Sequence, residues 1–144
     1  MRQFLQRTLL MLLLLMGVST MAMAQKGLQV ERLFAGKVVP RQKMTETFVK
    51  GQRLSSYRLT LFRSLRFTAT EAERQQVEAL VRNDAKTATS KEVDIRNGQW
   101  QYALCQLPPT HTQRYLCYQR TGNSLLVVYL EGSATLSELK NMFI

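Results

Sequence analysis

The sequence is poor in the residue types that most often carry enzymatic chemistry. Its 144 residues include a single histidine, His111, which lies in a Pro-Pro-Thr-His-Thr segment without a nucleophile or an orienting acid beside it. A histidine that acts as a catalytic base needs both of these partners. We therefore predict a protein that is not an enzyme, that binds no cofactor, and in which His111 is a solvated loop residue.

Cysteine is also scarce. The only two, Cys105 and Cys117, lie twelve positions apart, a spacing that matches no standard zinc-binding pattern. We therefore expect no metal site. In an oxidising compartment an even pair of cysteines favours a disulfide instead.

Apolar runs of membrane-spanning length are missing. The longest, around Leu9–Leu15, has roughly eleven apolar residues, whereas a spanning helix needs about 20. Arg2 and Arg7 precede this run and Ala22-Met23-Ala24 follows it, which is the layout of a cleavable export signal. We predict that residues 1–24 are a signal peptide cleaved after Ala24. Residues 25–144 are then a single domain without a transmembrane segment, periplasmic, secreted or on the cell surface.

Acidic residues are outnumbered, with 10 Asp and Glu against 20 Lys and Arg. Loss of Arg2 and Arg7 with the signal peptide leaves 18 basic residues and a formal charge of +8. Such a charge bears on partners rather than on the fold. Because export removes the protein from most nucleic acid, we expect an anionic envelope component, a glycan or an acidic protein as partner. A solvated basic surface without a specific partner is the other interpretation of this charge. The stretch 48–70 contains no acidic residue and is interpreted either as an anion-binding strand or as a solvated basic face.

Periodic segments separated by turn residues predict an α+β domain. Asn97-Gly98 is a strong hairpin signal because both residues tolerate positive φ. Thr70 with Glu73, and Thr135 with Glu138, have capping-box spacing. We expect a mainly antiparallel sheet, a meander, with helices packed on one face. The expected helices are 28–34, 70–88 and 133–144, and the expected strands are 43–50, 54–67, 91–96, 99–107, 114–120 and 125–130.

The turns also predict which strand residues face each other. The Asn97-Gly98 turn places Ile95 opposite Trp100. A loop centred on His111 places Cys105 directly opposite Cys117, within disulfide range. We therefore predict a Cys105–Cys117 disulfide, with two buried free thiols as the alternative if the centre of the loop lies one residue away.

The same register sorts the side chains of the last four strands into two faces. One face is aliphatic and small, and helices are expected to cover it; it holds Ala103, Cys105, Leu107, Tyr115, Cys117, Leu126, Val128 and Leu130. The other face is aromatic and holds Ile95, Trp100, Tyr102, Leu104, Leu116, Tyr118, Val127 and Tyr129.

The aromatic face is the candidate binding site, because a large exposed apolar patch usually marks a contact surface. Flat rings with hydroxyls suit sugar rings or an extended peptide. The candidate residues are Trp100, Tyr102, Tyr118 and Tyr129, with Arg58 and Arg120 as neighbours. The alternatives are that other parts of the monomer cover this face, that it forms a homodimer, or that it docks another envelope protein.

Four segments resemble a family of small exported proteins of unknown function from Bacteroidota. They are residues 28–34 (LQVERLF), 57–65 (YRLTLFRSL), 126–132 (LVVYLEG) and 136–143 (LSELKNMF). The resemblance implies a periplasmic or outer-surface protein of a Gram-negative cell and carries over no catalytic residue. The sequence thus favours a non-enzymatic binding or envelope-associated module, with an accessory subunit as alternative and an enzyme third.

Overall fold

The computed structural model describes residues 27–143, so the predicted signal peptide and its cleavage after Ala24 lie outside the described residues. None of the helices in the described range is long and apolar enough to span a membrane. In chain order the elements are α2 (Glu31–Phe34), η2 (Arg41–Lys43), β1 (Met44–Lys50), η3 (Gln52–Tyr57), β2 (Leu59–Thr68), α3 (Glu71–Ala85), β3 (Ser90–Arg96), β4 (Gln99–Leu107), β5 (Gln113–Thr121), β6 (Ser124–Gly132) and α4 (Leu136–Phe143).

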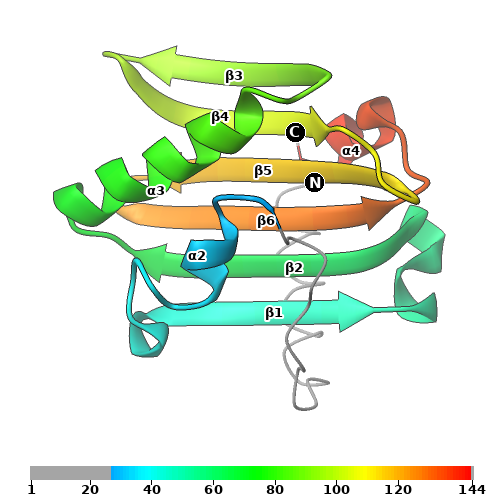
Figure 1. Cartoon of the computed structure of the whole chain (residues 1–144), viewed down its shortest axis with the longest axis horizontal. Helices are drawn as coiled ribbons and strands as arrows, with labels where there is room; N and C mark the ends of the chain where they lie inside the picture. Colours follow the sequence, from blue (N-terminus) through cyan, green and yellow to red (C-terminus); the bar gives the residue numbers. More distant parts are fainter. Residues whose placement is uncertain (1–26, 144) are drawn as a thin grey trace.

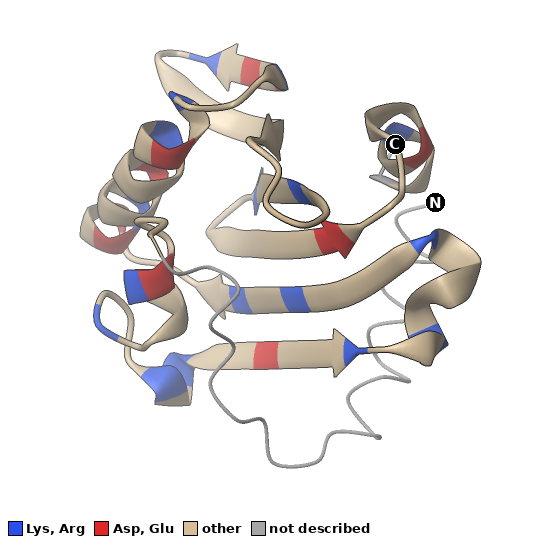
Figure 2. Ribbon diagram, turned by 45° about the vertical axis from the view of Figure 1, so that its right-hand side comes forward, with Lys and Arg blue, Asp and Glu red and all other residues tan. Residues whose placement is uncertain are grey.

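The six strands form one antiparallel sheet in the order β1-β2-β6-β5-β4-β3 (Figure 1). Tight connections join β3 through β6 into a meander, and β2 pairs with the last strand, which leaves β1 and β3 at the two edges. The predicted α+β class is confirmed. Helices lie on both sides of the sheet, however: α2 and α3 pack on one face and α4 on the other (Figure 2).

Local signals in the sequence predicted the turn and the helix starts correctly. Asn97 and Gly98 have φ values of 53° and 74°, as a primed turn requires. The Thr70 hydroxyl accepts the Glu73 N–H at 3.2 Å, and the Glu73 carboxylate accepts the Thr70 N–H at 3.0 Å. Thr135 and Glu138 repeat this arrangement at the start of α4.

The expected strand 54–67 begins later than the alternation of its residues suggested. Residues 52–57 form η3, and Arg58 takes a left-handed conformation, with φ 59°, before β2 starts at Leu59. The chain turns here because Gly132 of β6 lies against it: a Cβ on Gly132 would come within 2.5 Å of the Arg58 carbonyl oxygen.

The predicted disulfide is wrong because the register between β4 and β5 differs by one residue. Cys105 lies opposite Leu116, and Cys117 lies opposite Leu104. A shift of one residue sends a side chain to the other face of a sheet. Cys105 is therefore buried under α3, Cys117 is buried on the α4 side, and both are free thiols.

A bulge in β4 also changes the predicted faces. Ile95 pairs with Trp100 as expected, but Asp94 pairs with Tyr102, so Gln101 is an extra residue in β4. Trp100 and Tyr102 consequently point to opposite faces. The α2–α3 face combines members of both predicted sets: Trp100, Ala103, Cys105, Leu107, Leu116, Tyr118, Val127 and Tyr129. The α4 face holds Leu104, Tyr115, Cys117, Leu126, Val128 and Leu130.

Candidate functional site

Helix α3 packs over β4 and β5 with charged as well as apolar residues on its inner side (Figure 1). Arg74, Glu78 and Asp84 are only 5%, 8% and 5% exposed. Burial of an ionised group costs several kcal/mol unless a charged partner and hydrogen bonds compensate. Arg74 and Glu78 form ion pairs, and Asp84 accepts two backbone hydrogen bonds.

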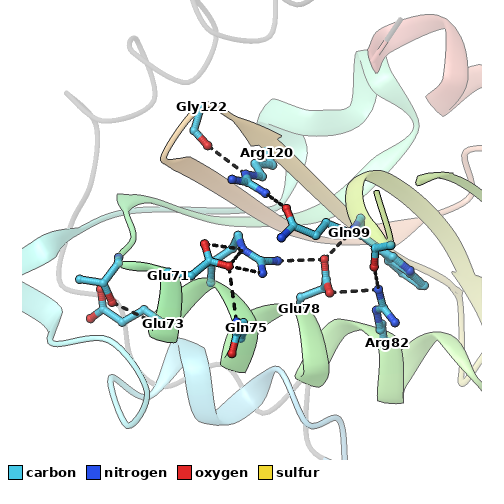
Figure 3. Close-up of polar contacts among 12 residues, drawn as sticks. Glu71, Glu73, Gln75, Glu78, Arg82, Gln99, Arg120 and Gly122 are labelled. Carbon is cyan, nitrogen blue, oxygen red and sulfur yellow. Dashed lines mark hydrogen bonds and ion pairs between the residues drawn. The ribbon is translucent and has the colours of Figure 1, made fainter. Parts of the chain in front are cut away.

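Glu78 is the centre of this cluster (Figure 3). One carboxylate oxygen accepts the Trp100 backbone N–H at 2.6 Å and an Arg74 N–H at 3.2 Å, and the other accepts from Arg82 at 3.0 Å. Arg82 also donates to the Gly98 carbonyl at 2.9 Å, and its guanidinium lies 5.2 Å from the Trp100 ring centre. Glu78 therefore joins α3 to the start of β4 and, through Arg82, to the β3–β4 turn.

Arg74 extends the cluster toward the start of α3. Its guanidinium bonds Glu71 at 2.6 Å, and this contact lowers the pKa of Glu71 and raises the pKa of Arg74. Tyr118 lies beside Arg74, and burial raises the pKa of the Tyr118 hydroxyl to about 12. Here the carboxylates face guanidinium groups, so the cluster stabilises the contact between helix and sheet.

Asp84 has a structural role that the sequence did not reveal. Its two carboxylate oxygens accept the backbone N–H groups of Gln29 and Val30 at 2.7 and 2.9 Å. Burial raises the pKa of Asp84, and these two hydrogen bonds oppose that rise. Asp84 thus fixes the segment that leads into α2 onto α3.

The candidate aromatic face is not a surface, which is a correction to the sequence interpretation. Trp100 is 8% exposed, and Tyr118 and Tyr129 are fully buried beneath α2 and α3. The Tyr129 hydroxyl donates to the Glu131 carboxylate at 2.6 Å inside the same core. In this fold these three rings have no area to offer a ligand.

The other three candidate residues are scattered. Tyr102 is half-buried on the opposite face, next to the α4 core. Arg58 is exposed between η3 and β2 and forms an ion pair with Glu138 of α4 at 2.9 Å. Arg120 donates to the Gln99 side chain at 2.5 Å and to the Gly122 carbonyl at 3.0 Å (Figure 3). The six residues therefore do not form one site.

Two of the five basic residues in the stretch 48–70 form ion pairs within the fold. Arg63 is buried, with its guanidinium 2.8 Å from the Glu46 carboxylate and 4.6 Å from the Phe34 ring centre. Arg58 is paired with Glu138. Lys50, Arg53 and Arg66 of this stretch stay exposed.

An open hollow of about 480 Å³ lies between α2 and β1 and is bordered by basic side chains. Gly36, Lys37, Val38, Pro40, Arg41 and Gln42 line it. Gly36 has φ 76°, and a Cβ there would come within 2.7 Å of the Arg41 side chain, so the glycine lets Arg41 lie across the loop. Lys37 and Arg41 are exposed and form no ion pair within residues 27–143.

The described residues contain no group of side chains that could bind a metal ion. Within the described part of the chain, His, Cys, Asp and Glu form no cluster of three or more. The sequence offered no sign of the hollow, since Lys37 and Arg41 stand four positions apart in an irregular loop.

The chain belongs to a family of unknown function, DUF6108, which it matches over residues 17–143. No curated protein and no solved structure matches it.

Proposed function

We propose that this member of the DUF6108 family is an exported, non-enzymatic module that binds an anionic partner at the hollow bordered by Lys37 and Arg41. The observation that carries the proposal is that Lys37 and Arg41 are exposed, border an open hollow and form no ion pair with any residue of the described range 27–143. Basic groups on a concave surface concentrate the potential that attracts an anion. The export-signal pattern supports the location, because it directs the expected partner toward the envelope rather than toward nucleic acid.

The buried titratable groups support a binding role rather than catalysis. Glu78 and Asp84 use their carboxylate oxygens for contacts that hold α3 and α2 in place. Lys37 and Arg41 at the hollow, in contrast, are exposed and have no ion-pair partner among residues 27–143.

The test is the salt concentration at which the exported protein elutes from a sulfated-dextran resin. The variant Lys37→Glu/Arg41→Glu should elute at clearly lower salt than wild type, because each basic contact near an anionic surface contributes about 1 kcal/mol. The matched control is Lys86→Glu/Lys91→Glu, which makes the same charge change at two other exposed lysines without an ion pair. Equal shifts in both variants would mean that only net charge matters and would refute the site.

The intact mass of the protein recovered from the periplasm or the medium tests whether the protein is exported and cleaved after Ala24. The expected mass is that of residues 25–144, and a full-length or cytoplasmic product would contradict export.

A further inference from the structure

The outer edge of β1 carries backbone groups that no strand in the described range pairs with. β1 pairs only with β2 and ends the sheet. The Gly51 N–H donates to the Thr60 carbonyl at 3.0 Å. Because bonded and non-bonded pairs alternate along an antiparallel ladder, the N–H and C=O groups of Glu46, Phe48 and Lys50 point away from β2.

The middle of this edge lacks the charges that usually protect an edge strand. Thr45, Thr47, Phe48 and Val49 have high β propensity and no charge. The one charged residue among them, Glu46, is turned inward onto Arg63 at 2.8 Å. The central charge of β1 is therefore bound to Arg63 and does not extend over the outer edge of the strand.

Basic residues stand at both ends of the same edge (Figure 2). Lys37 and Arg41, at the hollow, come before β1 in the chain. Lys50 is the last residue of β1, and Arg53 follows it in η3. All four are exposed, and none forms an ion pair within residues 27–143. A ligand strand on β1 would thus meet uncharged backbone in the middle and positive charge at each end.

We propose that β1 accepts an extended peptide segment of a partner protein as a seventh strand, and that acidic residues flanking this segment bind the two basic ends. Main-chain hydrogen bonds supply affinity in this mode of recognition, and the flanking side chains supply specificity. This inference rests on the proposed function, because the hollow with Lys37 and Arg41 is one of the two basic ends of the β1 edge.

A second copy of the chain fits this edge less well than an acidic peptide. Antiparallel pairing of two β1 strands would bring the basic residues before one strand, Lys37 and Arg41, toward those after the other, Lys50 and Arg53. Like charges directly opposite each other destabilise a strand pair. The charge pattern therefore favours a partner with the opposite sign.

The experiment compares two peptides by fluorescence anisotropy with the exported protein. One has two acidic residues at each end of an alternating valine and threonine centre, and the other replaces its valines with proline. Proline keeps the charge but removes the N–H groups that a strand needs. We expect the proline peptide to bind at least about tenfold more weakly, since each lost hydrogen bond is worth about 1 kcal/mol. Lys50→Glu should weaken the first peptide, whereas Lys91→Glu on β3 should not.

Each other outcome overturns the inference in a recognisable way. Equal affinity for the two peptides means charge binding without strand addition. Equal effects of Lys50→Glu and Lys91→Glu mean that β1 is not the edge used. Stable dimers that exclude the peptide mean that a second copy occupies the edge. Binding of neither peptide refutes the inference, while the sulfated-dextran comparison still decides the proposed function separately.

Discussion

The two outer strands of the sheet are built differently. β3 is exposed along most of its length and carries Lys91, Glu92, Asp94 and Arg96, so charge protects its edge. In β1 only Thr45 and Lys50 are exposed, and its central charge, Glu46, is bound to Arg63. The exposed charges of β3 oppose the addition of a strand at that edge. The edge at which we propose strand addition, β1, has no such row of exposed charges.

The β3 edge and the β1 edge of the sheet are also attached to the helices by different contacts. The β3–β4 hairpin is attached to α3 through Glu78 and Arg82, whereas the β1 side is attached through ion pairs at Glu46 and Lys43. Substitutions on each side can therefore test which contacts stabilise the fold.

The largest effect is expected from Glu78→Ala on the β3 side. It leaves the buried Trp100 N–H without its acceptor and the buried Arg74 guanidinium with Glu71 alone, and loss of one partner from a buried pair costs about 3–5 kcal/mol. Urea denaturation should show a loss of unfolding free energy in that range. Glu71→Ala removes an acid whose side chain is 58% exposed, and should cost far less unfolding free energy than Glu78→Ala, because exposed ion pairs contribute little. Similar losses in both variants would contradict the central place of Glu78.

Alkaline pH should next weaken the α3–sheet contact through Tyr118. Burial raises the pKa of Tyr118 to about 12 from 10.0, so the folded state keeps this proton more tightly than the unfolded chain. The resulting stabilisation is fully present below pH 10 and is lost as pH rises through about 12. Absorbance titration of phenolate in wild type and Tyr118→Phe isolates this group, and a difference curve with its midpoint near pH 10 would disprove the burial.

On the β1 side, Arg63→Met should destabilise the protein by about 1–2 kcal/mol. The substitution keeps most of the apolar stem over Phe34 but leaves the Glu46 carboxylate, 19% exposed as a side chain, without its partner. Adding Glu46→Gln should recover part of the loss, because the remaining group is then uncharged. If the double variant is less stable than Arg63→Met, the unpaired Glu46 carboxylate is not a cause of the destabilisation.

A smaller effect is expected at the β3–β4 turn. Gly98 has φ 74° and open space around its Cα, so Gly98→Ala meets backbone strain alone, worth about 1 kcal/mol. Thermal unfolding should show a modest fall in Tm. An unchanged Tm would mean that the turn relaxes without cost.

The smallest effect should come from Lys140→Ala. The Lys140 ammonium lies 2.6 Å from Glu92 on β3, but the two side chains are 32% and 47% exposed. Exposed ion pairs contribute about 0–1 kcal/mol. A loss well above 1 kcal/mol in urea denaturation would show that α4 secures β3 more firmly than we infer.

The sequence predicted those features that depend on neighbouring residues. The Asn97-Gly98 turn and the capping boxes at Thr70 and Thr135 are complete within a few positions, and the structure confirms them. The antiparallel class followed from these short connections.

Features that depend on long loops or on tertiary contacts were not predictable. The loop between β4 and β5 moved the register by one residue, which separated Cys105 from Cys117. The bulge at Gln101 separated Tyr102 from Trp100. The sequence does not show which basic residues form ion pairs. Arg58 and Arg63 pair with acids that are distant in the sequence, so Lys37 could be distinguished from them only in the folded structure.

Amide hydrogen exchange on the exported protein, with and without the valine-containing acidic peptide, tests the difference between the two edges most directly. We predict that the peptide slows exchange of the outward amides of Glu46, Phe48 and Lys50, and leaves the amides of β3 unchanged. Equal protection of both edges, or none at β1 under saturating peptide, would contradict the account.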